Sequence, residues 1–199
     1  MPVSHPRRAV RRGLTIAVAA VTALIGAAGP AAAVHQPVVL DRGDVIPCLA
    51  PLSRDGTDEV VFLGTLHRAH AVRGLQIRMR AGERLDLEYF VPDLAPENTL
   101  SPGVLPKVYL IAPDRQVEVI EATFRFPFTN PDNGQKYLAL ASYETLAAAG
   151  TYSVLVTGPA ESRFAVAHGR EDAGSTFDGV LRGRIATGAE VDRWYATAP

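Results

Sequence analysis

The chain is poor in cysteine: Cys48 is the only one among its 199 residues. A single cysteine excludes any disulfide within the chain, so an apolar core must hold the fold together. Free cysteine behaves as a small apolar residue that is commonly found inside proteins, and we expect Cys48 to be buried. Pairing with a cysteine of a second chain is the alternative.

Long apolar runs are nearly absent, with one exception at residues 14–25. Four arginines between positions 7 and 12 precede this run, and three alanines at 31–33 follow it. This order is typical of a cleavable export signal, and the run is shorter than the ~20 residues that a membrane-spanning helix needs. We therefore predict a signal peptide over residues 1–33, no retained transmembrane helix, and a secreted or cell-envelope location. The general secretory route and, because of Arg11–Arg12, the twin-arginine route both fit.

The chain also lacks an excess of basic residues, with 20 Lys and Arg against 21 Asp and Glu. Every acidic residue lies beyond position 33, so removal of the signal would leave a mildly acidic protein. No cluster of Lys and Arg with interleaved aromatic residues is present. These features argue against nucleic acid as the principal partner.

What is present is a pattern of short strands. Residues 34–58 contain three prolines, which predict an extended leader with one edge strand at 38–40. From residue 59 onward, apolar and polar residues alternate with a period of two, as in half-buried strands. The expected strands cover residues 75–79, 85–89, 107–111, 116–121, 124–128, 136–140, 151–156 and 163–167.

Such strands, separated by Gly and Pro, predict an all-β fold: a single jelly-roll-like antiparallel β-sandwich over residues 59–168. Pro127 should place the strand at 124–128 at a sheet edge. Residues 169–199 are polar and interrupted by glycine, which predicts an irregular C-terminal tail. Short helices are expected only at 143–149 and 189–196.

Residues 81–84 are turn-like and predict that 75–79 and 85–89 form an antiparallel hairpin. In the register that keeps the core side apolar, Ile77 faces Tyr89 and Met79 faces Leu87. The charged residues on the solvent side, which would form cross-strand ion pairs, are Arg78, Arg80, Asp86 and Glu88.

Three segments carry a resemblance to a known family: 79–87, with a Gly turn before an alternating strand; 108–114, with a Pro-Asp turn; and 150–158, with a Gly-Thr-Tyr strand entry. Their order and spacing make residues 60–168 resemble bacterial pre-peptidase C-terminal-type domains. The resemblance implies a small jelly-roll β-sandwich on a secreted protein. It also implies a non-catalytic module that binds proteins, polysaccharides or other surfaces, often beside a protease. The segment 170–195 resembles the juxtamembrane end of anchored relatives.

His67 and His70 are the one pair of histidines close together in the sequence, and they are the candidate metal ligands. The flanking strands place both on a connecting loop, where solvated histidines are the simpler interpretation. A metal site needs at least a third ligand, which His35, His168 or a carboxylate would have to supply through the fold. No cofactor is predicted.

No catalytic residue is predicted. The chain has no Gly-x-Ser-x-Gly elbow, no phosphate-binding loop and no dinucleotide fingerprint. Asp86 and Glu88 could serve as a glycosidase pair, but the strand pattern assigns both to a solvated sheet face. Residues 130–134 offer oxygen ligands for calcium, but turns require the same residue types, and we predict a turn.

The leading hypothesis from the sequence is therefore a secreted, non-catalytic binding module for a protein or a polysaccharide. Its candidate contact surface comprises the loop 92–106 and three aromatic residues, Tyr89, Phe90 and Tyr109. A second hypothesis is a small exported hydrolase that uses His67, His70 or His168 with a carboxylate. A third is a structural cell-envelope protein whose Trp194–Tyr195 segment docks on a membrane or a partner.

Overall fold

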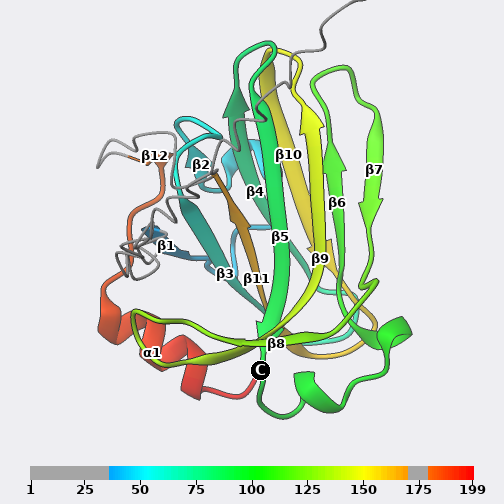
Figure 1. Cartoon of the computed structure of the whole chain (residues 1–199), viewed down its shortest axis with the longest axis vertical. Helices are drawn as coiled ribbons and strands as arrows, with labels where there is room; N and C mark the ends of the chain where they lie inside the picture. The colour runs from blue at the N-terminus through cyan, green and yellow to red at the C-terminus, as the bar shows by residue number, and fades with distance from the viewer. Residues whose placement is uncertain (1–35, 170–178) are drawn as a thin grey trace, which may run out of the picture. The chain divides into compact units, whose positions relative to one another are not determined.

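The structure, a computed structural model, describes residues 36–169 and 179–199. These residues form two β-sheets of six strands each, together with one α-helix (Figure 1). The expected all-β class is confirmed. The predicted signal peptide, residues 1–33, lies outside the described residues.

The first sheet contains, in spatial order, β1 (Gln36–Val39), β3 (Val60–Leu66), β11 (Ser162–His168), β5 (Arg84–Pro92), β9 (Lys136–Leu146) and β8 (Phe126–Thr129). The second sheet contains β12 (Val180–Arg182), β2 (Leu52–Ser53), β4 (Val72–Met79), β10 (Gly150–Thr157), β6 (Lys107–Ile111) and β7 (Val117–Ile120). β1 and β8 are edge strands of the first sheet, as Pro37 and Pro127 led us to expect.

Both sheets are mixed rather than purely antiparallel. β1 pairs with β3 in parallel, and so does β2 with β4, whereas the other pairs are antiparallel. The expectation of an antiparallel fold was wrong at these two pairs. The connections between the parallel partners are long enough to return the chain to the same end of the sheet, which two strands need in order to run in the same direction.

The predicted hairpin of residues 75–79 with 85–89 was also wrong. β4 lies between β2 and β10 in the second sheet, whereas β5 lies between β11 and β9 in the first. The connection at 80–83 crosses from one sheet to the other, with Gly82 in the left-handed region at φ 80°. Arg80 accordingly pairs with Asp55 at 3.0 Å and with Glu83 at 3.1 Å, whereas Asp86 pairs with Arg84 at 2.9 Å.

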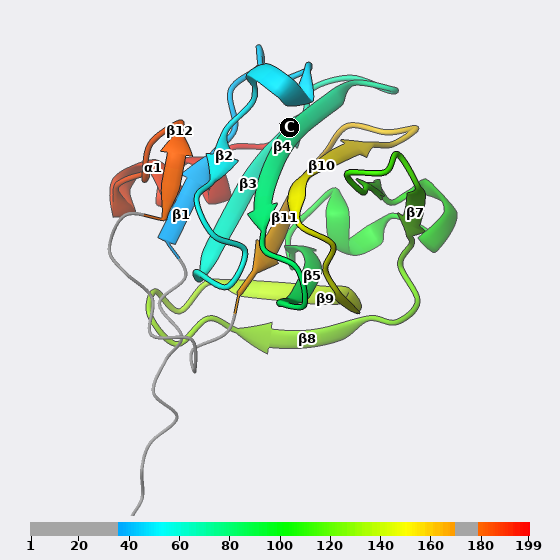
Figure 2. The ribbon, with the colours of Figure 1, turned by 90° about the horizontal axis from the view of Figure 1, so that it is seen from above.

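The inward faces of the strands agree with the alternation in the sequence. Ile77 is fully buried and Leu87 is 2% exposed, although they belong to different sheets. Side chains of β3, β5, β9 and β11 meet those of β4, β6 and β10 in one large apolar cluster between the sheets, which lie face to face when the protein is seen from above (Figure 2). This cluster is the core that a chain without disulfides requires.

A second apolar cluster lies on the outer face of the first sheet, beneath helix α1 (Gly188–Ala196). It includes Leu63 of β3, Ala165 of β11, and Val191 and Trp194 of the helix. Because this cluster covers its outer side, β11 is buried along all seven of its residues. Residues 179–199 are therefore not an irregular tail: they contribute β12 and a helix that shields the sheet.

The helix expected at 189–196 is confirmed, and Thr187 and Glu190 form a reciprocal capping box at its start. The helix expected at 143–149 was wrong. Residues 143–146 extend β9, where Thr145 pairs with Leu85 and Leu146 with Arg84. Cross-strand pairing thus overrides the helical propensity of the segment. Among the residues that the structure describes, no helix has both the length and the apolar character needed to span a bilayer.

Cys48 is exposed, contrary to expectation. It lies in a 3-10 helix (η1, Pro47–Leu49) that follows β1, and the neighbouring Ile46 and Leu49 are 54% and 68% exposed. Pro47 opens this single turn, which presents the thiol outward.

Candidate functional site

The three aromatic residues predicted to bind a ligand lie on different surfaces. Tyr89 points into the core, is 2% exposed, and donates its hydroxyl to the carbonyl oxygen of Pro106 at 2.8 Å. Burial raises the pKa of its phenol. Tyr109 is half-buried on β6 of the second sheet. The structure therefore does not bring Tyr89 and Tyr109 together with Phe90 on a common surface.

Phe90 lies on the outer face of the first sheet and belongs to a cluster of aromatic rings. Its ring meets Phe128 edge to face at 5.5 Å and Tyr137 at 5.2 Å between centroids. Phe128 and Tyr137 stack with their centroids 5.6 Å apart. Phe90 and Phe128 are half-buried, whereas Tyr137 is 3% exposed. Edge-to-face and offset contacts of this kind hold rings in defined positions.

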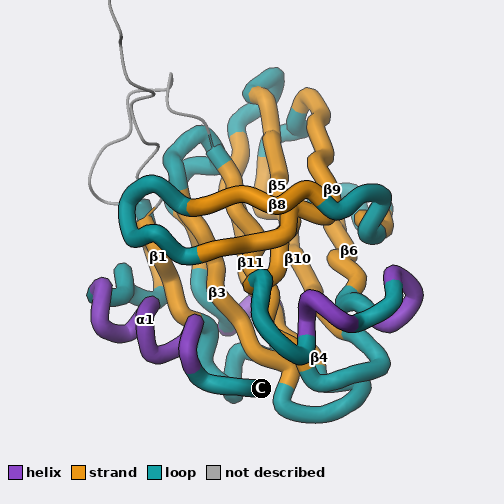
Figure 3. Tube along the Cα trace, turned by 60° about the horizontal axis from the view of Figure 1, so that its bottom comes forward, coloured by secondary structure: helices purple, strands orange, loops and turns teal. Residues whose placement is uncertain are grey.

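These three rings line a cavity of about 440 Å³, which we call the aromatic cavity. Apolar residues of β3 and α1, including Leu63 and Val191, complete its walls. The β8–β9 hairpin folds back so that its turn lies beside helix α1 (Figure 3). The cavity is thus built from strands and a helix that are far apart in the sequence: its β3 and α1 residues are separated by more than one hundred positions. Its volume falls within the range of small-ligand sites.

The turn at residues 130–135 supplies part of the cavity wall. The Asn130 side chain accepts the Asp132 N–H at 2.9 Å, and the Asn133 side chain accepts the Gln135 N–H at 3.0 Å. Gly134 takes a positive φ of 71°. These are the hydrogen bonds and the backbone shape of a tight turn, which confirms the turn expected here.

The charges at the cavity are all of one sign. Glu88 of β5, Asp132 of the turn and Asp192 of α1 line it, and none of its described lining residues is Lys, Arg or His. A hydrogen-bonded chain orients one of these acids: the Tyr137 hydroxyl donates to Gln135 at 2.6 Å, and the Gln135 amide donates to Asp192 at 2.9 Å. Burial raises the pKa of the Tyr137 phenol, so this hydroxyl keeps its proton and serves as a donor.

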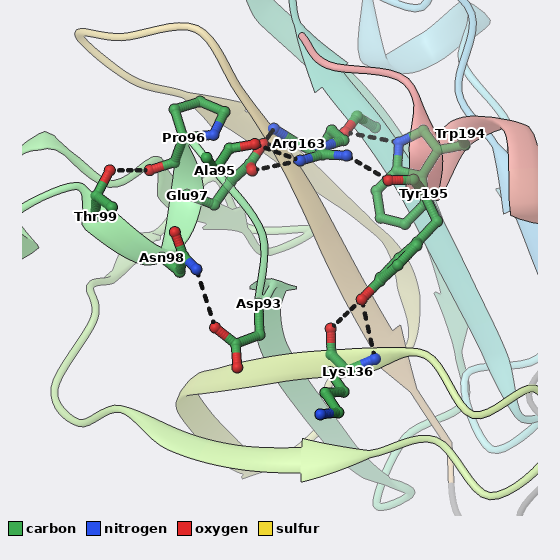
Figure 4. A network of polar contacts seen from close by, with 11 residues as sticks. Asp93, Ala95, Pro96, Glu97, Asn98, Thr99, Lys136, Arg163, Trp194 and Tyr195 are labelled. Carbon is green, nitrogen blue, oxygen red and sulfur yellow. Dashed lines mark hydrogen bonds and ion pairs between the residues drawn. The ribbon is translucent and has the colours of Figure 1, made fainter.

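A buried ion pair between Glu97 and Arg163 belongs to a polar network that reaches the end of helix α1 (Figure 4). Both oxygens of Glu97 accept from the Arg163 guanidinium, at 2.9 and 2.7 Å, and the two side chains are 0% and 2% exposed. Arg163 also donates to the carbonyl oxygens of Ala95 and Tyr195, which ties the loop after β5 to the end of α1. A fork-like guanidinium satisfied on all sides in this way fixes the elements that it joins.

Tyr195 connects this network to the aromatic rings of the cavity. Its hydroxyl donates to the Lys136 carbonyl oxygen at 2.8 Å and accepts the Lys136 N–H at 3.0 Å. Its ring meets Tyr137 edge to face at 5.4 Å. Trp194 donates its indole N–H to the carbonyl oxygen of Gly64 at 3.2 Å. Both aromatic residues of the C-terminal segment are therefore engaged within the fold, where the third hypothesis needed them free to dock.

His67 and His70 lie on the loop between β3 and β4, as expected. Partial burial and the neighbouring Arg42 and Arg73 lower the pKa of His67. His70 is exposed, with a positive φ of 58°, and its backbone N–H donates to the Gly158 carbonyl oxygen at 2.7 Å. Across residues 36–169 and 179–199, no group of three or more His, Cys, Asp or Glu side chains is placed to hold a metal ion.

His168 lies at the opposite end of its strand from this histidine pair. In the register of β3 with β11, Leu66 pairs with Ser162 and Val60 pairs with His168. Six residues of extended chain, roughly 20 Å, separate these two pairs. His168 is 1% exposed and packs against the Phe62 ring. The histidines of the hydrolase hypothesis therefore do not converge on one site.

A second hollow, of about 450 Å³, lies on the other face of α1, and we call it the mixed-charge hollow. Its charged lining residues are Asp41, Arg42, Asp44, Arg182, Arg184, Glu190 and Arg193. Several of these are satisfied internally: Arg184 binds Glu190 through two hydrogen bonds, at 2.8 and 2.5 Å, and Arg182 donates to Ala50 and Gln76.

Sequence reasoning identified Phe90 but missed Phe128, Tyr137 and Asp192. It assigned Glu88 to a solvated strand face and Asp132 to a turn, and did not place either at this cavity. The alternation of Phe124, Phe126 and Phe128 was a usable signal, since aromatic residues recur on one side of a strand expected at an edge. Comparison with known proteins adds no further assignment: no protein-family model and no curated protein matches this chain.

Proposed function

We propose that this chain is an exported, non-catalytic binding module, and that its ligand, a protein or a polysaccharide, docks in the aromatic cavity. The observation that carries the proposal is the cavity itself. Three aromatic side chains with defined contacts line a hollow of about 440 Å³, and a network of buried hydrogen bonds supports it. Aromatic walls with a few oriented polar groups are typical of binding sites.

Two features of the sequence support the same proposal. The predicted signal peptide at residues 1–33 would direct the protein to the outside of the cell or to the envelope. The resemblance of residues 60–168 to pre-peptidase C-terminal-type domains, which are jelly-roll modules of secreted proteins, favours binding over catalysis. The separation of His168 from His67 and His70 means that these three histidines do not converge in one pocket, as the hydrolase hypothesis would have required.

The test compares the wild-type chain with two variants on glycan and peptide arrays. Phe128→Ala removes a wall of the cavity, whereas Phe126→Ala removes a ring from the same strand that is 65% exposed and does not line the cavity. We expect the wild type and Phe126→Ala to bind the same ligands, and Phe128→Ala to bind them about tenfold more weakly or not at all. Blank arrays with the wild type, or equal losses in both variants, would contradict the proposal.

Export is tested separately. Expression of the full-length chain in a bacterial host should yield protein outside the cytoplasm, with Val34 as its first residue. Recovery of an unprocessed chain in the cytoplasm would remove the predicted location and leave the proposed binding site unaffected.

A further inference from the structure

The aromatic cavity carries an electrostatic preference. Glu88, Asp132 and Asp192 come from a strand, a turn and a helix, and all three line the same hollow. Arg163 does not line the cavity, and the Glu97 carboxylate accepts two hydrogen bonds from its guanidinium. Since no described lining residue is basic, the cavity presents a negative potential to its occupant.

The aromatic rings also favour a positively charged occupant. The faces of aromatic rings attract cations, and a planar guanidinium can stack on a ring while it donates to carboxylates. Phe128 and Tyr137 stack with an interplanar angle of 23°, and Phe90 stands nearly perpendicular to both. The cavity thus has ring surfaces in two orientations, next to acids from three separate elements.

The position of one of these acids is set before any ligand arrives. The Gln135 amide holds one oxygen of Asp192, and the Tyr137 hydroxyl in turn holds Gln135. Tyr137 is thus both a wall of the cavity and an anchor for its acidic rim. Such preorganisation lowers the ordering cost that binding would otherwise have to overcome.

We propose that the occupant of the aromatic cavity is the positively charged side chain of an Arg or a Lys in a basic segment of a protein partner. This inference rests on the proposed function and specifies its ligand. A volume of about 440 Å³ lies near the lower end of ligand cavities, which suits one or two side chains better than a polymer chain. The cationic side chain would stack on the rings and donate to the carboxylates, while the remainder of the basic segment stays outside.

The test is a calorimetric titration of the full-length chain with two matched peptides, hexa-arginine and hexa-citrulline. Citrulline keeps the length and shape of arginine but has no charge. We expect hexa-arginine to bind about tenfold or more tightly than hexa-citrulline, and to weaken as salt is added. Equal affinities for the two peptides would overturn the inference.

Variants distinguish binding of hexa-arginine in the cavity from its general electrostatic attraction to an acidic protein. Asp132→Asn and Asp192→Asn should each weaken hexa-arginine binding about threefold to tenfold, and Phe128→Ala should weaken it at least as much. The matched control is Asp114→Asn, which removes an exposed acid from the β6–β7 turn of the second sheet. A loss in the control as large as in Asp132→Asn would overturn the inference.

Spermidine, a small polyamine, tests the alternative that the cationic ligand is a free small molecule and not a side chain of a protein. Binding of spermidine to the cavity as tight as that of hexa-arginine would overturn the assignment to a protein segment. If neutral glycans bind the wild type and lose affinity in Phe128→Ala, while hexa-arginine does not bind, the ligand class is wrong and the proposed function stands. If no probe or array ligand binds the cavity, both fail.

Discussion

Helix α1 lines two hollows of nearly equal volume, about 440 and 450 Å³, and their difference lies in chemistry rather than in size. In the mixed-charge hollow, arginines and acids occur together and Arg184 and Glu190 neutralise each other. In the aromatic cavity, three acids line the wall with no basic partner among the described lining residues. A cavity whose charges are satisfied internally has little to offer a charged ligand, whereas one with a single sign of charge selects for the opposite sign. This difference is the reason why we propose the aromatic cavity, and not the mixed-charge hollow, as the binding site.

The largest expected effect comes from the Glu97–Arg163 ion pair, whose guanidinium also donates to the carbonyl oxygen of Tyr195 in α1. Arg163→Met leaves the Glu97 carboxylate buried without its partner, which should lower the free energy of unfolding by about 3–5 kcal/mol. Urea denaturation followed by circular dichroism measures this loss. The double variant Glu97→Gln/Arg163→Met removes both charges and should recover much of the stability. A free energy of unfolding for Arg163→Met within about 1 kcal/mol of the wild type would mean that the pair does not hold the loop after β5 to the end of α1.

A smaller loss of stability is expected from removing the contact between α1 and β9, which Tyr195 makes next to the aromatic rings. Tyr195→Phe removes the hydroxyl that bonds both backbone groups of Lys136, and should lower the free energy of unfolding by about 1–2 kcal/mol. The same urea experiment measures it, with Tyr109→Phe on the second sheet as the matched control. If the two variants lose the same stability, the bonds from Tyr195 to Lys136 add nothing specific to the support of the cavity.

The start of α1, on the side of the mixed-charge hollow, should respond to acid. Hydrogen bonds from Arg184 and from the backbone of Thr187 lower the pKa of Glu190 from its ordinary value of 4.5 to about 2. Because folding lowers this pKa, the stabilising contribution is fully present above about 4.5 and is lost as the pH falls toward 2. Fluorescence of Trp194, the one tryptophan of the chain, should report loosening of the helix over that range.

Glu190→Gln should flatten the response of Trp194 between pH 4.5 and 2, because the side chain no longer titrates. Glu118→Gln, which removes an exposed acid from β7, is the control and should leave it unchanged. An acid response that persists in full in Glu190→Gln would exclude the capping box as its source.

The smallest expected effect tests the charge of Arg42, which lines the mixed-charge hollow together with His67. Partial burial and the charge of Arg42 both lower the pKa of His67, so Arg42→Gln should raise that pKa part of the way toward its ordinary value. A pH titration of the His67 ring proton by NMR measures the shift. Arg115→Gln, in the β6–β7 turn, should leave the pKa of His67 unchanged. An unchanged pKa in Arg42→Gln would show that burial and Arg73, without Arg42, account for the lowering.

The candidate site was only partly accessible to sequence reasoning. Phe90 could be identified as an aromatic residue of a strand, and the alternation placed Tyr89 on the core side of that strand, opposite to Phe90. Phe128, Tyr137 and Asp192 come from an edge strand, a neighbouring strand and a helix that meet only in the folded chain. No spacing in the sequence predicts that these three residues lie close together, because each belongs to a different strand or helix.

By itself the sequence determined the class of the fold and the inward-facing side chains, since a period of two places Ile77, Leu87 and Tyr89 on buried faces in any sandwich. It also determined the C-terminal helix. Only the tertiary structure decided which strands are neighbours, that β4 and β5 belong to different sheets, and that α1 and the β8–β9 hairpin enclose an aromatic cavity. The physical reason is that alternation describes the two sides of a strand and is the same for every possible partner, whereas pairing depends on the packing of the whole core.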